Sequence, residues 1–172
     1  MQQLYLTGNH AGDLAGQLFT ALNVRPVGCR LTPFEVDGSL RGETMHLLLP
    51  PAPPLHNDVP CRLLLAPGRW AVVPEVLEEI AAPGLTAARG VHAPMLLSGL
   101  TRDVLRCRPF REAVAACLAG SRPVVVAAAL DAAAVLKKLT PAEDQLWFDV
   151  PDDRAGQAAL LETLVPEAVL RF

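Results

Sequence analysis

Apolar residues form two kinds of pattern along the chain, short continuous runs and sets at helical spacing. Residues 3–7 (QLYLT) form a short strand-like run that ends at Gly8. A turn-like stretch follows, and Leu14, Leu18 and Leu22 then recur at helical spacing, which predicts a helix to about residue 23. A strand, a glycine-containing turn and a helix in this order are typical of a βα unit of a doubly wound sheet.

The next region has the pattern of a β-hairpin. Residues 24–31 and 44–49 have the composition of strands, and residues 36–39 (VDGS) between them have turn chemistry. We therefore expect a hairpin within about residues 24–49. The proline-rich stretch that follows predicts an exposed connection over about residues 50–60, because proline lacks an N–H group and fixes φ. This connection is too short to divide the domain.

The rest of the chain alternates between strand and helix patterns. Residues 124–129 (VVVAAA) are apolar at every position, as in a strand that is covered on both faces. Asp152 and Asp153 precede the last helical pattern, where acidic residues are favourable at a helix N-terminus. The predicted elements are strands at 61–65, 94–97, 124–129 and 145–150, and helices at 72–82, 110–118, 132–139 and 154–164. The pattern predicts a single α/β domain over residues 1–172, with a mainly parallel sheet, flanking helices and an inserted hairpin.

Composition and charge argue against some classes of partner and cellular location. Of the 172 residues, 51% are hydrophobic and 19% are charged, which is enough to bury one sizeable core. No apolar run approaches the roughly 18–20 residues of a membrane span, and residues 1–4 (MQQL) do not resemble a secretory signal. We therefore expect a cytoplasmic protein with no membrane partner. The net charge of −3 argues against nucleic acid as a partner.

The cysteines and histidines show no metal-ligand spacing. The cysteines have no C-x-x-C pair and are expected to be small buried hydrophobic residues rather than metal or redox groups. The histidines are far apart in the sequence. We therefore expect no metal and no cofactor. The residues concerned are Cys29, Cys61, Cys107, Cys117, His10, His46, His56 and His92.

Four segments resemble a known family in their order and spacing. They are residues 4–8 (LYLTG) before a helix, residues 27–42 with their glycines, residues 108–125 with RPFREAV and RPVV, and residues 148–154 (FDVPDDR). Together they resemble the small kinase-like P-loop nucleoside-triphosphatases that were first known from thermophiles and are also called cancer-related nucleoside-triphosphatase. The resemblance implies a P-loop NTPase-like fold.

The catalytic residues of that family have no counterpart in this chain. A P-loop has the form G-x-x-x-x-G-K-[ST], in which the lysine contacts phosphates and the hydroxyl binds magnesium. Counting from Gly8, the second glycine is replaced by Asp13, the lysine by Leu14 and the hydroxyl residue by Ala15. The vestigial phosphate loop therefore consists of Gly8, Asn9, His10, Ala11, Gly12, Asp13, Leu14 and Ala15.

Asp13 would itself oppose phosphate binding. At ~4 Å and an effective dielectric of ~20, two like charges repel by roughly 4 kcal/mol. The glycine turn and the N-terminus of the helix still offer backbone N–H groups to an anion. His10 has two interpretations, an anion contact or proton-transfer group, or a solvated loop histidine.

The magnesium-binding acids are missing as well. The family has a D-E-x-G element at the end of a strand, and the positions of its two acids are Ser98 and Gly99 here. Ordinary magnesium-dependent hydrolysis is therefore not expected. We still expect a concave surface where residues 8–13 meet the end of the strand at 95–98, the alternative being a collapsed turn.

Three functions remain open at this stage. The leading hypothesis is a catalytically degenerate P-loop NTPase-like protein that acts as a binding or regulatory module for a protein partner or a small ligand. The alternative is a divergent nucleotide-binding protein or nucleoside-triphosphatase with a rearranged site, in which Lys137 or an arginine replaces the missing lysine. A third is an unrelated enzyme of the doubly wound class. The sequence does not distinguish ligands, partners or oligomeric states.

Overall fold

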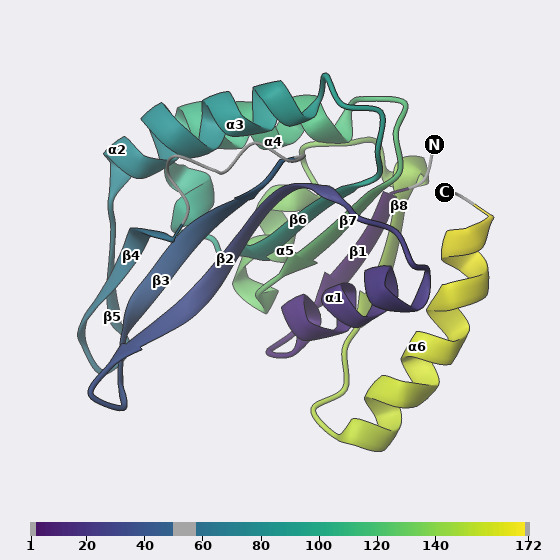
Figure 1. Ribbon diagram of the computed structural model, residues 1–172, viewed down its shortest axis with the longest axis horizontal. Helices are drawn as coiled ribbons and strands as arrows, with labels where there is room; N and C mark the ends of the chain where they lie inside the picture. The colour runs from purple at the N-terminus through teal and green to yellow at the C-terminus, as the bar shows by residue number, and fades with distance from the viewer. Residues whose placement is uncertain (1–2, 50–57, 171–172) are drawn as a thin grey trace.

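A computed structural model describes residues 3–49 and 58–170, which form an eight-stranded sheet with helices on both faces (Figure 1). The strands are β1 (Gln3–Thr7), β2 (Val27–Val36), β3 (Ser39–Leu48), β4 (Val59–Ala66), β5 (Arg69–Val72), β6 (Met95–Leu100), β7 (Val124–Ala128) and β8 (Gln145–Asp149). The helices are α1 (Ala11–Ala21), α2 (Pro74–Val76), α3 (Ala82–Ala88), α4 (Arg108–Leu118), α5 (Ala133–Leu136) and α6 (Arg154–Val169). A π-helical turn, η1 (Leu77–Ala81), joins α2 to α3, and the short 3-10 turns are η2 (Val104–Arg106), η3 (Leu130–Ala132) and η4 (Ala142–Asp144).

The sheet has a parallel part and an antiparallel part. Its strand order is β5-β4-β3-β2-β6-β7-β1-β8. The five strands from β2 to β8 in this order are parallel, whereas β3, β4 and β5 continue the sheet beyond β2 as an antiparallel arm. The predicted α/β class and the hairpin within residues 24–49 are therefore confirmed. The arm is larger than predicted, because it contains β4 and β5 as well as the hairpin.

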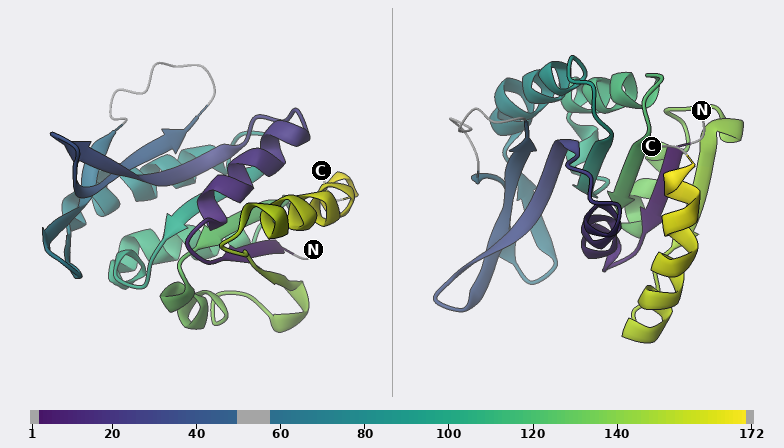
Figure 2. Two further views of the ribbon diagram at one scale, coloured as in Figure 1. Left: turned by 90° about the horizontal axis from the view of Figure 1, so that it is seen from below. Right: turned by 45° about the vertical axis from the view of Figure 1, so that its right-hand side comes forward.

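Residues of β1 alternate between two cores. Tyr5 packs with the apolar side chains beneath α3, α4 and α5, whereas Leu4 and Leu6 pack on the opposite face against α1 and α6. This alternation follows from the pleat of a strand, in which successive side chains point to opposite faces. Figure 2 shows the helices on the two sides of the twisted sheet. The predicted doubly wound arrangement is thus present.

Most predicted elements lie where the pattern placed them, but several boundaries are different. The helix predicted at 72–82 begins at Pro74 and continues to Ala88, and residues 69–72 before it form β5, a strand that was not predicted. Its π-helical turn lies beside Pro83, whose missing N–H group interrupts the regular α-helical ladder. The final helix extends to Val169 rather than 164.

The predicted connection at 50–60 lies partly outside the described residues. Its last two residues, Val59 and Pro60, begin β4 and pair with Met45 and Thr44. In the part of the chain that the structure describes, no helix is long and apolar enough to cross a membrane.

Candidate functional site

A turn of three residues joins the first strand to the first helix. Gly8, Asn9 and His10 are the only residues between Thr7 and Ala11. Gly8 has a φ of 122°, a conformation that favours glycine, and its N–H donates to the Ala128 carbonyl at 3.2 Å. A P-loop places its longer glycine-rich segment between strand and helix, and its backbone N–H groups surround the phosphates. The turn between β1 and α1 is shorter than that segment.

The remaining positions that the sequence assigned to a vestigial phosphate loop, residues 11–15, lie within α1. Leu14 is 1% exposed and Ala15 is fully buried, and both pack in the core between α1 and the sheet. The side chains at the two positions that the sequence count assigned to the lysine and the hydroxyl residue therefore face the core. Ala11 is also buried, whereas Gly12 and Asp13 lie at the surface of the first turn.

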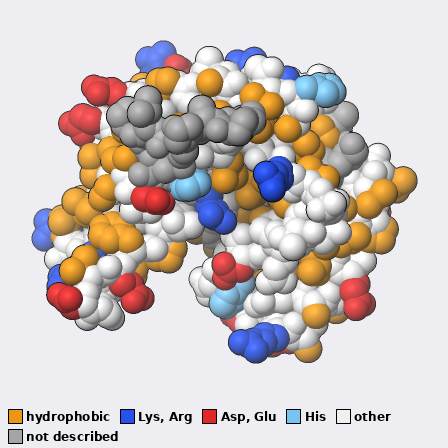
Figure 3. All heavy atoms as spheres, viewed as in Figure 1, with side chains coloured by type: hydrophobic (Ala, Val, Ile, Leu, Met, Phe, Trp, Pro, Cys, Tyr) orange, Lys and Arg blue, Asp and Glu red, His pale blue; other side chains and the backbone are white. Residues whose placement is uncertain are grey.

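A cleft of about 1410 Å³ lies where the sequence predicted a concave surface, between α1 and the antiparallel arm. It opens beside the arm in the space-filling view (Figure 3). The structure brings residues 8–13 to one wall, β2 to the facing wall, and the carboxyl ends of β6 and β7 to the floor. Its polar lining includes Asn9, His10, Asp13, Gln17, Thr20, Arg30, Thr32, Glu43, Arg62, Ser98, Thr101, Asp131, Asp152, Arg154 and Gln157.

Ser98 and Gly99, the predicted acid positions, lie at the floor of the cleft. Ser98 is 1% exposed, and a Cβ atom on Gly12 would lie 3.0 Å from its Oγ. Gly12 thus allows α1 to pack closely over Ser98. Gly99 has a φ of 81°, and a side chain there would overlap the Leu31 carbonyl, so its role is to fit β6 against β2.

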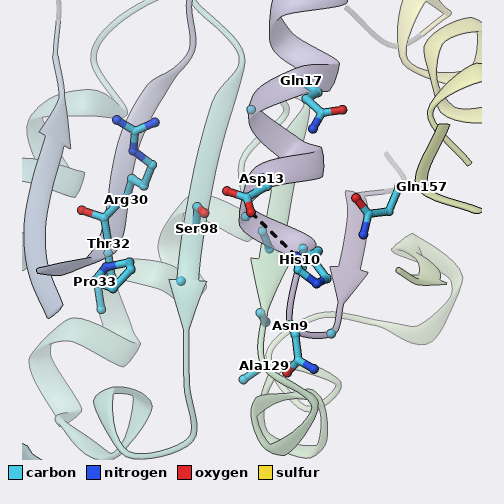
Figure 4. Close-up of a pocket in the computed structure, with 18 of the residues that line it drawn as sticks. Asn9, His10, Asp13, Gln17, Arg30, Thr32, Pro33, Ser98, Ala129 and Gln157 are labelled. Atoms are coloured by element: carbon cyan, nitrogen blue, oxygen red, sulfur yellow. Dashed lines mark ion pairs between the residues drawn. The ribbon is translucent and has the colours of Figure 1, made fainter. Parts of the chain in front are cut away.

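Acidic side chains gather around the turn, and most are engaged with neighbours. Asp13 lies 3.9 Å from His10 Nδ1 (Figure 4). The Asp152 carboxylate accepts a 3.4 Å hydrogen bond from Asn9, and Asp131 accepts one from the Arg102 N–H. Among the described residues, no group of three or more histidine, cysteine or acidic side chains could hold a metal ion.

A charged cluster that the sequence did not indicate lies where the arm meets the end of β6. Arg62 donates to Asp103 at 2.7 Å and to Glu43 at 3.2 Å, and its guanidinium lies 4.2 Å above the Trp70 ring. Thr101 also donates to Asp103. The cluster joins β3, β4 and β5 to the segment after β6. Glu43 and Arg62 were missed because their partners lie 19 and 41 residues apart in the sequence.

Burial shifts the ionisation of this cluster. Burial raises the pKa of Glu43, and the positive charge of Arg62 offsets that effect only in part. Burial also acts to raise the pKa of Asp103, but hydrogen bonds from Thr101 and Arg62 outweigh it and hold the pKa below its ordinary value.

The cysteines lie apart from the cleft. Cys29, Cys61 and Cys117 are buried, and burial raises the pKa of Cys61 to about 12 and that of Cys117 to about 11. Burial raises the pKa of Cys29 still further. These three side chains are therefore neutral thiols that fill the core, as the sequence predicted. Cys107 is half-buried, and burial raises its pKa also.

The alternative hypothesis of a rearranged nucleotide site requires Lys137 or an arginine in the cleft. Lys137 lies over the Trp147 ring at 5.1 Å from its centroid, at the β8 edge, and is not among the residues that line the cleft. Arg30 and Arg154 do line the cleft. Neither arginine makes an ion pair with the described residues, whereas Arg62 is held by two carboxylates.

The strand order and the helices on both faces define a P-loop NTPase-like fold. The chain is similar to the crystal structure of THEP1 from the hyperthermophile Aquifex aeolicus, with a TM-score of 0.69 over 97% of this chain and 98% of that chain. The sequence identity is 14%, so the likeness shows the fold alone. No protein-family model and no curated protein matches the sequence.

Proposed function

We propose that this chain is a binding or regulatory module that uses a P-loop NTPase-like fold without nucleotide hydrolysis. The observation that carries this proposal is the three-residue turn between β1 and α1, with Leu14 and Ala15 buried in the core. Phosphoryl transfer depends on positioning the phosphates and neutralising their charge. The turn is too short to surround phosphates, and neither buried side chain can contact them.

The floor of the cleft supports the same proposal. A magnesium ion in such enzymes is held by carboxylates and a hydroxyl near the phosphate loop. Ser98 and Gly99 supply no carboxylate at the end of β6, and Asp103, which follows, is held by Arg62 and Thr101. The end of β6 thus provides no unpaired carboxylate that could hold a magnesium ion.

The cleft is the reason to propose binding. It persists at the carboxyl ends of the parallel strands, where open α/β sheets bind ligands. Its lining mixes acidic, basic and amide groups, which suits a polar ligand or a polar segment of a partner protein. We place this module in the cytoplasm, in keeping with its free cysteines, and propose no role in binding nucleic acid or membranes.

A second candidate is nucleotide binding through a rearranged site. It is favoured by Arg30, an exposed arginine on the β2 wall that makes no ion pair with the described residues. An arginine at this wall could neutralise a phosphate without a P-loop lysine.

Titration with nucleotides separates the two candidates. We expect no heat of binding when ATP or GTP with magnesium is titrated into the protein, and no turnover at even the ~1 s⁻¹ low end of common enzyme rates. Arg30→Gln and the matched variant Arg41→Gln, at the far end of the hairpin, provide the comparison. Binding that Arg30→Gln abolishes and Arg41→Gln retains would establish the second candidate. Magnesium-dependent turnover would overturn the first.

A further inference from the structure

The cleft carries opposite charges on facing walls. Asp13 projects from α1 and Arg30 from β2, on the two sides of the β6 strand that bears Ser98 (Figure 4). The Asp13 side chain is 80% exposed, and the Nδ1 atom of His10 lies at the long distance of 3.9 Å from its carboxylate. Arg30 is exposed and makes no ion pair or side-chain hydrogen bond with the described residues. The two charges do not meet across the cleft, so each remains available to a ligand.

The floor between them holds a buried hydroxyl that lacks a partner. Ser98 is 1% exposed and lines the cleft, and its Oγ makes no hydrogen bond to any described residue. Buried polar groups are nearly always hydrogen-bonded, so this hydroxyl is free to bond to a group that enters the cleft.

We propose that the cleft binds a zwitterion, a ligand that carries an ammonium group and a carboxylate group. The ammonium group is placed at Asp13, the carboxylate at Arg30, and a polar group between them bonds to Ser98. This inference rests on the proposed function, since it assumes that the site does not take a polyphosphate. Asp13 favours a cation and repels phosphate, whereas an arginine recognises carboxylate through paired N–H groups.

Free amino acids and short peptides share this chemistry. They differ in the distance between their two charged ends. The cleft volume of about 1410 Å³ exceeds the roughly 300–1,000 Å³ of common small-molecule sites, which leaves room for a peptide of several residues. The length of ligand that binds best will therefore distinguish the two sources.

The test uses glycine, diglycine, triglycine and tetraglycine, which present the two charged ends without side chains. Each is titrated into the full chain and followed by calorimetry and by backbone amide NMR shifts. N-acetylated and C-amidated forms of the same compounds remove one charge at a time. We expect one length to bind best, and removal of either end to weaken its binding by about tenfold.

Matched protein variants assign each end to its wall. Asp13→Asn should weaken binding of the unmodified ligand by about tenfold and leave binding of the acetylated ligand unchanged. Arg30→Gln should weaken binding of the unmodified ligand by about tenfold and leave binding of the amidated ligand unchanged. Arg41→Gln, outside the cleft, should leave binding unchanged. Ser98→Ala should weaken binding without lowering the free energy of unfolding, because it removes a hydroxyl that has no partner in the free protein.

Two results would overturn the inference. One is the absence of amide shifts in residues 9–17, 28–32 and 98–99 with every glycine compound at about 10 mM, a concentration that detects even millimolar affinity. The other is an equal loss in Asp13→Asn for acetylated and unmodified ligand. Nucleotide titration is scored separately, so a protein that binds neither nucleotide nor zwitterion would fail this inference and leave the loss of nucleotide handling standing.

Discussion

Arg62 contacts two carboxylates whose pKa values move in opposite directions. Burial acts to raise the pKa of Asp103, but the hydrogen bonds from Thr101 and Arg62 stabilise its ionised form more strongly, so its pKa is lowered. Burial destabilises the ionised form of Glu43 more than the charge of Arg62 stabilises it, so the pKa of Glu43 is raised. The Arg62–Asp103 contact is also the shorter of the two, at 2.7 Å against 3.2 Å. The stabilising part of the cluster is therefore the contact between the arm and the segment after β6.

We expect Asp103→Asn to be more destabilising than Glu43→Gln at neutral pH. The lowered pKa of Asp103 means that its ionised form stabilises the fold above its ordinary pKa of 3.8, and that this contribution is lost as the pH falls through the folded-state value. The raised pKa of Glu43 has the opposite sign, so stability is lost as the pH rises from 4.5 through its folded-state value. Asp103→Asn should lower the free energy of unfolding by about 1–3 kcal/mol at pH 7, and Glu43→Gln by less.

Urea unfolding of both variants at pH 7 and at a pH well below 3.8, the ordinary pKa of Asp103, gives the measurement. Asp103→Asn should lose less stability than the unaltered protein on acidification. Equal losses in the two variants at pH 7 would show that Arg62 stabilises both carboxylates alike, against this prediction.

At the scale of elements, α1 and α6 begin in different ways. Asp153 is the N-cap of α6, and its Oδ1 accepts a 2.7 Å hydrogen bond from the Gly156 N–H. His10 gives α1 no such bond. We expect Asp153→Ala to lower the free energy of unfolding by about 1 kcal/mol. Asp153→Asn should keep most of the stability that the cap contributes, since asparagine also caps helices.

Asp152→Ala is the matched control for that cap. Among the described residues, the Asp152 carboxylate accepts only a 3.4 Å hydrogen bond from exposed Asn9. Removal of this carboxylate should therefore lower the free energy of unfolding by under about 0.5 kcal/mol. Urea midpoints at constant m-value give the comparison. A loss in Asp152→Ala as large as that in Asp153→Ala would assign the stabilisation to acidic charge at the helix end rather than to the cap.

The same elements show what the sequence could predict. The run at 124–129 and the helical spacing at 110–118 depend on local apolar patterns, and both elements were found there as β7 and α4. The strand β5 was missed because residues 69–72 are few and their apolar character runs on into the helix that follows. Pairing with β4, which the local pattern does not contain, makes these residues a strand.

The candidate site shows a similar limit. Counting along the P-loop form placed the apolar residues Leu14 and Ala15 at functional positions, and the structure places both in the core. The count could not predict the residue at which α1 begins, because no capping side chain precedes Ala11, the first residue of the helix. The position of Arg30 opposite Asp13 depends on strand order, because β2 lies beside β6 rather than beside β1.

At the scale of the whole molecule, the arm and the parallel strands share one core. Met45 of β3 and Cys61 of β4 belong to the same cluster of buried residues as Tyr5 of β1. The sheet is continuous across the junction, where residues 27–30 of β2 pair with residues 95–98 of β6. The contact of Arg62 with Asp103 crosses the same junction.

The two tryptophans lie at opposite edges of this sheet, Trp70 on β5 and Trp147 on β8. If the chain is one domain, as the sequence predicted, both should report one cooperative transition, because a shared core unfolds as a unit. Trp70→Phe leaves Trp147 as the only tryptophan, and Trp147→Phe leaves Trp70. In urea, we expect the fluorescence midpoint of each variant to coincide with its own midpoint by far-ultraviolet circular dichroism. A Trp70 signal lost at lower urea than the dichroism signal would show that the arm unfolds separately. In that case Asp103→Asn, which removes the charged contact across the junction, should widen the gap between the two transitions.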